Sequence, residues 1–231
     1  MNAALHSIVK AGLGRGHEVF GIPRGYAGLL EGRAAPLSAA EVDGISRHGG
    51  TVLGSARSKE LPTPAGQERA LAQLSVLGFH GLIVIGGNGS LAGAHALAGR
   101  SPCRIVGLPA SIDNDIGHSG LAIGVDTAVN TIVEACDRIS DTARAHHRAF
   151  IVEVMGRQCG YLAMRAGIAA EADAILYAER DVTEDEMVAE LRQVLRRSFS
   201  PPRDKKRVLI MKAEGVKVPT PEALAALLDL L

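Results

Sequence analysis

The stretch GLIVIGGNGSLAG, Gly81–Gly93, decides the fold class of this chain. Its first part, GLIVI, has the residues of a buried strand, two glycines follow, and SLAGAHALAG, Ser90–Gly99, reads as the start of a helix. A strand, a glycine turn and a helix start aim free backbone N–H groups at one point, where an anion such as phosphate binds. A carboxylate that holds Mg²⁺ against the phosphates is expected in such a turn, but the residue there is the amide Asn88.

The same alternation of strand and helix continues along the chain. Strands are predicted at 18–22, 81–85, 104–108, 149–154, 172–177 and 207–211. Helices are predicted from Ala4 to Leu13, from Thr63 to Leu77, from Asp126 to Asp141, from Thr183 onward and from Thr220 onward. Capping boxes are predicted at Ser38–Glu41 and Thr183–Glu186. Such alternation is typical of an α/β fold with a parallel sheet and crossover helices.

Composition excludes several classes of protein. The chain has 231 residues and 47% hydrophobic residues, enough for one large or two small domains. Its 25 basic residues balance 25 acidic ones and only 3% are aromatic, which argues against nucleic acid as a partner. No stretch resembles a signal peptide or approaches the roughly 20 apolar residues of a membrane span, so we expect a cytoplasmic protein without a membrane partner. Cys103, Cys136 and Cys159 lack metal-site spacing and are predicted to be reduced thiols.

A second group of polar residues follows the next predicted strand. In LPASIDNDIG, Leu108–Gly117, the carboxylates Asp113 and Asp115 stand two residues apart in a loop at the carboxyl edge of the sheet. One carboxylate can take a proton from a hydroxyl while the other orients it or helps to hold a metal. Spacing alone leaves open a structural alternative, a loop with Asx turns and a helix cap.

These motifs stand in order with HGGTVLGSAR, His48–Arg57, and VEVMGR, Val152–Arg157, and together they resemble the ATP-dependent 6-phosphofructokinase family over essentially the whole chain. The resemblance implies doubly wound parallel sheets in two Rossmann-like lobes, 1–124 for the nucleotide and 125–231 for the sugar phosphate, with the active site in the cleft between them. It also implies the glycolytic transfer of the γ-phosphoryl group of ATP, with Mg²⁺, to the 1-hydroxyl of fructose 6-phosphate, giving fructose 1,6-bisphosphate.

The resemblance further implies a role for each matching residue. Asp113 would accept the proton of the sugar hydroxyl, Asp115 would assist it, and Ser111 would hydrogen-bond the transferring phosphoryl group. An arginine fork suits a phosphate dianion and the developing charge, so Arg157 would act in both catalysis and sugar-phosphate binding. The other sugar-phosphate residues implied are Met155, Gly156, Arg148 and Glu214, and the nucleotide residues are Arg57, Gly87, Asn88, Gly89 and Ser90.

Three of these positions carry further expectations. Arg148 matches an arginine that the family supplies from a neighbouring subunit, which implies a homo-oligomer. Arg57 would reach the nucleotide phosphates, although an ordinary surface arginine is the alternative. Asn88 occupies the position of the family's Mg²⁺-serving aspartate, and an amide oxygen can still contact a metal without the negative charge.

Two alternatives concern the phosphoryl donor and the extent of the site. Pyrophosphate-using relatives carry Asp and Lys where this chain has Gly89 and Ala110, and these small residues favour ATP over pyrophosphate. The family's first strand with its Gly-rich loop and its later His-x-Gln-Arg-Gly-Gly region are expected to be missing, so little activity is expected of the chain by itself. The alternatives are a non-catalytic fragment or regulatory subunit, a pyrophosphate-dependent phosphofructokinase, or another kinase with a GGDG-type loop.

Overall fold

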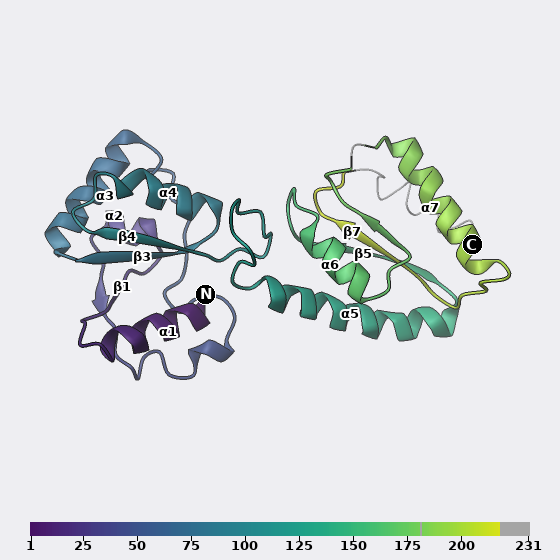
Figure 1. Ribbon diagram of the computed structural model, residues 1–231, viewed down its shortest axis with the longest axis horizontal. Helices are drawn as coiled ribbons and strands as arrows, with labels where there is room; N and C mark the ends of the chain where they lie inside the picture. The colour runs from purple at the N-terminus through teal and green to yellow at the C-terminus, as the bar shows by residue number, and fades with distance from the viewer. Residues whose placement is uncertain (181, 218–231) are drawn as a thin grey trace. The chain divides into compact units, whose positions relative to one another are not determined.

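Residues 1–180 and 182–217 are described by the computed structural model, in which the chain folds as two units, Met1–Ala110 and Ser111–Leu231 (Figure 1). The boundary lies earlier than the expected one at Gly124. The reason is apolar packing, because Ile112 and Ile116 contact the core of the second unit around Val125. The helix predicted from Thr220 lies outside the described residues.

The first unit contains the parallel pair of strands that the opening stretch predicts. In chain order its elements are α1 (Asn2–Leu13), β1 (Phe20–Gly21), α2 (Tyr26–Leu30), β2 (Ala35–Pro36), the 3₁₀ helix η1 (Ile45–Arg47), α3 (Pro64–Leu77), β3 (Gly81–Gly86), α4 (Asn88–Ala98) and β4 (Arg104–Pro109). β3 and β4 pair in parallel, with α4 as the crossover helix, whereas β1 and β2 form a short antiparallel ribbon.

The helix signals of the sequence succeed where their caps lead into a hydrophobic face. The Thr63 hydroxyl accepts a hydrogen bond from the Gly66 N–H at 3.0 Å, and α3 ends at Gly78 in the left-handed conformation, with φ 66°. The box at Ser38–Glu41 forms its hydrogen bonds too. It leads only to turns and η1, because Gly44 adopts a left-handed φ of 71° that interrupts helical geometry.

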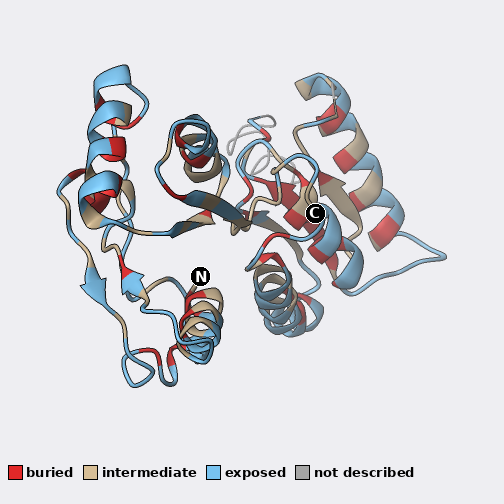
Figure 2. Cartoon of the chain, turned by 60° about the vertical axis from the view of Figure 1, so that its left-hand side comes forward, coloured by how far each residue is buried: buried red, intermediate tan, exposed pale blue. Residues whose placement is uncertain are grey.

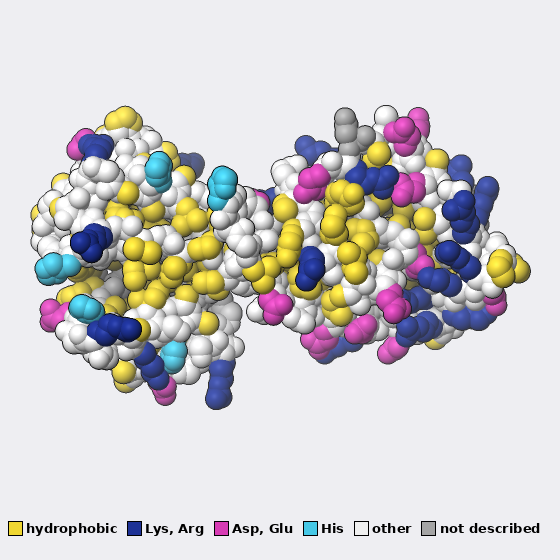
Figure 3. Space-filling view, in the orientation of Figure 1, with side chains coloured by type: hydrophobic (Ala, Val, Ile, Leu, Met, Phe, Trp, Pro, Cys, Tyr) yellow, Lys and Arg dark blue, Asp and Glu magenta, His cyan; other side chains and the backbone are white. Residues whose placement is uncertain are grey.

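The two faces of the β3–β4 pair differ in burial. Leu82 and Ile105 pack on a cluster that includes Leu74 of α3 and Leu97 of α4. Ile83 and Val106, which are partners across the two strands, stay 46% and 53% exposed. Figure 3 shows hydrophobic side chains gathered over these strands. The first unit therefore buries one face of its parallel pair much more fully than the other.

The described part of the second unit contains a three-stranded parallel sheet with helices. Its elements are α5 (Val125–His146), β5 (Ala149–Val154), α6 (Tyr161–Ala169), β6 (Ala174–Leu176), α7 (Glu184–Phe199) and β7 (Val208–Ala213). The strand order is β5–β7–β6, and every residue of the central strand β7 is buried (Figure 2). Central parallel strands are apolar on both faces, which explains the run VLIM at 208–211.

Candidate active site

The carboxyl ends of β5 and β7 bring two conspicuous motifs together. Val154 pairs with Ala213, so the loop that begins at Met155 and the residue Glu214 leave the sheet at the same edge. The Glu214 N–H donates to the Val154 carbonyl at 2.9 Å. In return, the Gly156 N–H donates to the Glu214 Oε2 at 3.2 Å. The VMGR and KAEG motifs are therefore joined by both backbone and side-chain hydrogen bonds.

The loop with the two aspartates belongs to the same unit and meets this edge through Arg157. The Arg157 Nε lies 3.7 Å from the Asp113 Oδ2. The Asp113 side chain is only 14% exposed, whereas that of Arg157 is 68% exposed. At the loop's start, the Asp113 N–H donates to the Ser111 hydroxyl at 3.3 Å. The structure thus places a sheltered carboxylate against an accessible guanidinium.

Asn114 fixes the shape of this loop, a role that sequence reasoning missed. It has a left-handed φ of 52°, which Asn adopts more readily than most residues, and its Oδ1 accepts a hydrogen bond from the Ala122 N–H at 3.0 Å. This bond closes the segment between the aspartates and α5. The available signal was the residue type itself, an Asn between two aspartates in a predicted loop.

The electrostatics of the cluster suit a proton acceptor. Burial raises the pKa of Asp113 above its ordinary value, and the neighbouring carboxylates of Asp115 and, less strongly, Glu214 raise it further, while Arg157 opposes them. A carboxylate with a raised pKa is a stronger base than an ordinary aspartate and is still ionised when the pH exceeds that pKa. The arrangement can therefore take a proton from a hydroxyl and hold an anion beside it.

We expect the substitution Asp113→Asn to stabilise the second unit at neutral pH. Because the pKa of Asp113 is higher in the folded protein than in the unfolded chain, its contribution to stability is fully present below the unfolded pKa, about 4. That contribution is lost as the pH rises through the raised folded pKa. Asn mimics the protonated form, so the variant should unfold at higher urea concentration near neutral pH, and the gain should disappear below about pH 4.

Hydrogen exchange of β7 peptides across a urea series measures this stability in the second unit alone. Asp141→Asn is the control, since the Asp141 side chain is 84% exposed. An Asp113→Asn variant that is less stable than the parent protein near neutral pH would contradict the conclusion that the surroundings raise the pKa of Asp113.

Arg148 does not join this cluster within its own chain. It directly precedes β5, where its carbonyl accepts from the Val208 N–H at 3.3 Å, whereas Arg157 follows the other end of that strand. A strand of six residues spans about 20 Å at roughly 3.3 Å per residue. Arg148 is therefore near the amino end of the sheet and the Asp113 cluster near its carboxyl end.

The residues predicted to bind nucleotide lie in the first unit, at the β3–α4 turn. Gly87 is the N-cap of α4, whose first three residues are Asn88, Gly89 and Ser90. A Cβ on Gly86 would lie 2.5 Å from the Ser90 hydroxyl, so this tight turn requires glycine there. The first-turn N–H groups of a helix have no partner inside the helix, which suits the binding of phosphate. Arg57 lies apart from this turn in sequence, in an irregular segment, and is exposed.

The described residues contain neither a metal-binding cluster nor a helix that could span a membrane. Among residues 1–180 and 182–217, no group of three or more His, Cys, Asp and Glu is arranged to bind a metal ion. Over the same residues, no helix combines the length and the apolar character that crossing a bilayer requires.

Comparison with known proteins gives one consistent family. The sequence profile described as Phosphofructokinase matches residues 1–230. An ATP-dependent 6-phosphofructokinase of Thermotoga neapolitana is 45% identical over 215 residues, which cover 93% of this chain and 66% of that protein. The chain thus spans just under two thirds of the length of this curated relative.

Solved structures agree on the fold. Phosphofructokinase from Pichia pastoris in the T-state superposes with a TM-score of 0.90 at 33% identity, covering 99% of this chain and 28% of that one. A pyrophosphate-dependent phosphofructokinase from Marinobacter aquaeolei gives a TM-score of 0.82 at 20% identity, covering 99% and 61%, and shows the fold alone. The predicted α/β class with parallel sheets is confirmed, and so is the predicted resemblance. The chain belongs to the phosphofructokinase family.

Proposed function

We propose that this chain carries the catalytic and sugar-phosphate residues of an ATP-dependent 6-phosphofructokinase. The reaction is the transfer of the γ-phosphoryl group of ATP to the 1-hydroxyl of fructose 6-phosphate. The observation that carries the proposal is the cluster of Asp113, Arg157 and Glu214 at one sheet edge, in which burial raises the pKa of Asp113. The family's curated relatives, named for this activity, support it.

Each residue of the cluster has a defined task in this reaction. Asp113 accepts the proton of the sugar hydroxyl as that oxygen attacks the phosphoryl group, and Asp115 assists it. Ser111, two residues before Asp113, donates a hydrogen bond to the transferring phosphoryl group. Arg157 binds the sugar phosphate and stabilises the charge that develops, since its side chain is accessible while that of Asp113 is sheltered.

The remaining residues bind the two substrates. Glu214 accepts hydrogen bonds from sugar hydroxyls and already holds the Gly156 N–H, so that Met155 and Gly156 form the wall of the sugar-phosphate site. In the first unit, Gly87–Ser90 bind the nucleotide phosphates at the start of α4, and Arg57 joins them. The amide oxygen of Asn88 is a hard donor of the kind that Mg²⁺ prefers, and the ion, when bound with ATP, would neutralise phosphate charge.

ATP is favoured over pyrophosphate by the space at the β3–α4 turn. A Cβ on Gly89 would meet no atom within 4 Å, so nothing in the described first unit fills the position where a nucleotide needs room. The fold itself does not choose between donors, because one fold can host different substrates. A non-catalytic or regulatory role is the second candidate, and it predicts sugar-phosphate binding without turnover.

The position of Arg148 supports a homo-oligomer, for which we propose a cytoplasmic location. Its distance along β5 from the Asp113 cluster suits an arginine that serves the site of a neighbouring subunit rather than its own. In this arrangement each site is complete only when a second copy contributes Arg148.

Calorimetric titration with fructose 6-phosphate tests the proposed site. We expect saturable binding at a single site per chain, and no binding of unphosphorylated fructose because the Arg157 contact to phosphate is lost. In NMR spectra recorded during the same titration, the amide chemical shifts of Gly156 and Gly160, on either side of Arg157, should change. Equal binding of fructose and its phosphate, or no binding of either, would contradict the proposal.

In a chimera in which this chain replaces the 215 matched residues of the Thermotoga neapolitana relative, we expect Asn88→Asp to raise turnover at limiting Mg²⁺ by at least about tenfold, equivalent to roughly 1.4 kcal/mol. The added carboxylate restores a negative charge that attracts the ion, which the amide oxygen of Asn88 lacks. Turnover measured against Mg²⁺ concentration for both proteins decides the matter, with Asn88→Ala as the control that removes the oxygen. Superimposable curves for Asn and Asp would show that this position does not limit metal retention.

A further inference from the structure

The loop Met155–Gly160, which carries Arg157, is held by side chains at both ends. At its start, the Gly156 N–H donates to Glu214 at 3.2 Å. At its end, the Gly160 N–H donates to the Oε1 of Glu179 at 2.8 Å. Gly160 is the N-cap residue of α6, so the Glu179 carboxylate also lies at the positive end of that helix. Glu179 has no task in the proposed reaction.

A close backbone contact fixes the middle of the same loop. A Cβ on Gly215 would lie 2.1 Å from the Arg157 carbonyl oxygen and 3.2 Å from the Gln158 Cα. Both neighbours belong to the backbone, so a side chain at position 215 must displace the loop itself. Arg157 has a left-handed φ of 52°, which is uncommon for a residue with a side chain and persists only where the surroundings impose it.

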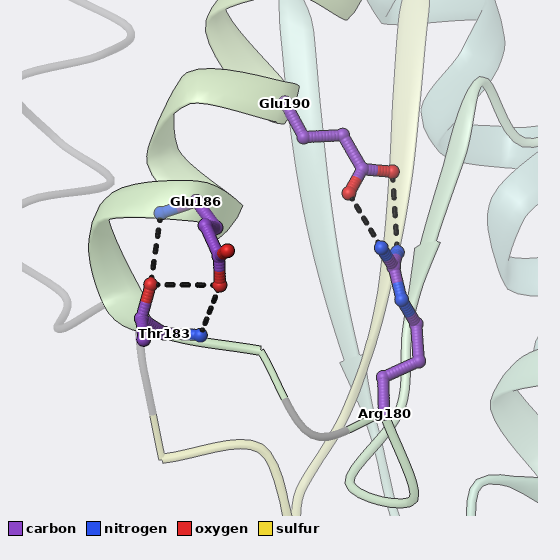
Figure 4. Close-up of polar contacts among 4 residues, drawn as sticks. All are labelled: Arg180, Thr183, Glu186 and Glu190. Atoms are coloured by element: carbon purple, nitrogen blue, oxygen red, sulfur yellow. Dashed lines mark hydrogen bonds and ion pairs between the residues drawn. The ribbon is translucent and has the colours of Figure 1, made fainter.

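The residue that follows Glu179 is anchored to α7. The next residue, Arg180, makes two hydrogen bonds to the Glu190 carboxylate of α7, at 3.2 and 2.9 Å. The start of α7 is fixed by the reciprocal hydrogen bonds of Thr183 and Glu186 (Figure 4). Glu179 therefore lies in the segment between β6 and α7, directly before a residue that is hydrogen-bonded to α7. These hydrogen bonds limit where its carboxylate can lie.

We propose that Glu179 and Gly215 are positioning residues that place Arg157 opposite Asp113. The inference rests on the proposed function for the role of Arg157, but the positioning is a property of the loop. The Arg157 side chain is 68% exposed, and 3.7 Å separates its Nε from the Asp113 Oδ2. Contacts of the side chain itself therefore hold the guanidinium only weakly in place. The backbone of the loop sets the placement of this side chain. Glu179 holds that backbone at Gly160, and the lack of a side chain on Gly215 leaves room for the backbone at Arg157.

The loop contains its own reporter, Cys159. Its thiol is partly exposed, whereas Cys103 and Cys136 are buried at 7% and 0% exposure. The rate at which a disulfide reagent modifies Cys159, assigned by peptide mass spectrometry, therefore measures loop order, and the two buried thiols report whether the fold is intact. This readout needs no activity and no ligand.

The matched variants are Glu179→Met, which removes the hydrogen-bond acceptor, and Glu179→Gln, which removes the charge but keeps an acceptor oxygen. We expect modification of Cys159 to be faster by about fivefold or more in Glu179→Met, with Cys103 and Cys136 still protected. In Glu179→Gln the rate should stay within about twofold of the parent rate. A parent-like rate in Glu179→Met would overturn the proposal.

Gly215→Ala tests the same loop by a second route. It decides the matter if Glu179→Met exposes all three thiols. Because the added methyl must displace the Arg157 backbone, we expect faster modification of Cys159 alone. Slow modification of Cys159 in Gly215→Ala would overturn the positioning role of this residue.

Adding fructose 6-phosphate to the same assay tests the proposed function and the positioning role of Glu179 separately. In the parent protein the sugar phosphate should slow modification of Cys159, and the concentration that halves the rate should rise about fivefold or more in Glu179→Met but not in Glu179→Gln. An absence of protection in the parent protein would contradict the proposed function. Protection with an unchanged half-point in Glu179→Met would instead contradict the positioning role, because a purely structural contact leaves affinity unchanged.

Discussion

Asp113→Asn is expected to lower kcat by about 10²–10⁴-fold while the Kd for fructose 6-phosphate stays within about threefold. Asn keeps the size of the side chain and leaves the N–H bond to Ser111 in place, but it cannot accept the proton of the sugar hydroxyl. A base acts mainly in the transition state, so its loss appears in turnover rather than in ground-state binding.

The measurement uses a chimera in which this chain replaces the 215 matched residues of the Thermotoga neapolitana relative. Steady-state kinetics give kcat, and calorimetry gives the Kd. Asp115→Asn is the matched control in the same loop, with a smaller expected loss because Asp115 is exposed and only assists. A large rise in Kd with unchanged kcat would remove Asp113 from the role of base.

Arg157→Met is expected to raise the Kd for fructose 6-phosphate by about 10- to 150-fold, the loss of charge-assisted hydrogen bonds worth roughly 1.5–3 kcal/mol. Met retains much of the apolar stem but no charge. Arg157 also lowers the pKa of Asp113, so its removal should shift the acid limb of the kcat profile to higher pH.

Calorimetry and the pH dependence of kcat in the chimera measure the two effects of Arg157→Met. Arg157→Lys is the control, which restores the charge but not the planar fork, and it should recover part of the affinity and most of the pH shift. A Kd that is unchanged in Arg157→Met would show that the sugar phosphate binds elsewhere.

The strands were predictable because their hydrophobic runs are continuous and bounded by glycine and polar residues. The predicted strand 149–154 has the bounds of β5, and 104–108 falls within β4. The helix predicted from Asp126 to Asp141 extends in the structure from Val125 to His146, because the polar residues of its last turns continue helical hydrogen bonding without an apolar periodicity. Boundaries of this kind depend on caps, here His147 in the left-handed conformation, rather than on burial.

Other features needed the folded chain. The strand order β5–β7–β6 puts the last of the described strands in the centre, and no local pattern in the sequence specifies which parallel strands become neighbours. The adjacency of Arg157 and Glu214 follows from that order, as does the contact between Gly215 and the Arg157 backbone. The motifs indicated which residue types do the chemistry, and the topology decides which of them meet.

The long-range contact of Glu179 illustrates the same limit. Its carboxylate bonds an N–H nineteen residues away in sequence, at the start of a helix that sequence patterns did not mark. Neither hydrophobic periodicity nor a capping box signals such a bond, because the partner is a backbone group of glycine. Only the nearby Thr183 cap belonged to a recognisable pattern, the predicted start of α7.

The central claim is that this chain supplies the base and the phosphate-binding arginine for transfer from ATP to the 1-hydroxyl of fructose 6-phosphate. Phosphorus NMR of the chimera with ATP, Mg²⁺ and fructose 6-phosphate tests it most directly, with pyrophosphate as the alternative donor. The account predicts that fructose 1,6-bisphosphate and ADP form in equal amounts, that pyrophosphate gives little product, and that Asp113→Asn stops the reaction. Product formed from pyrophosphate alone, or formed from ATP at an undiminished rate by Asp113→Asn, would contradict it.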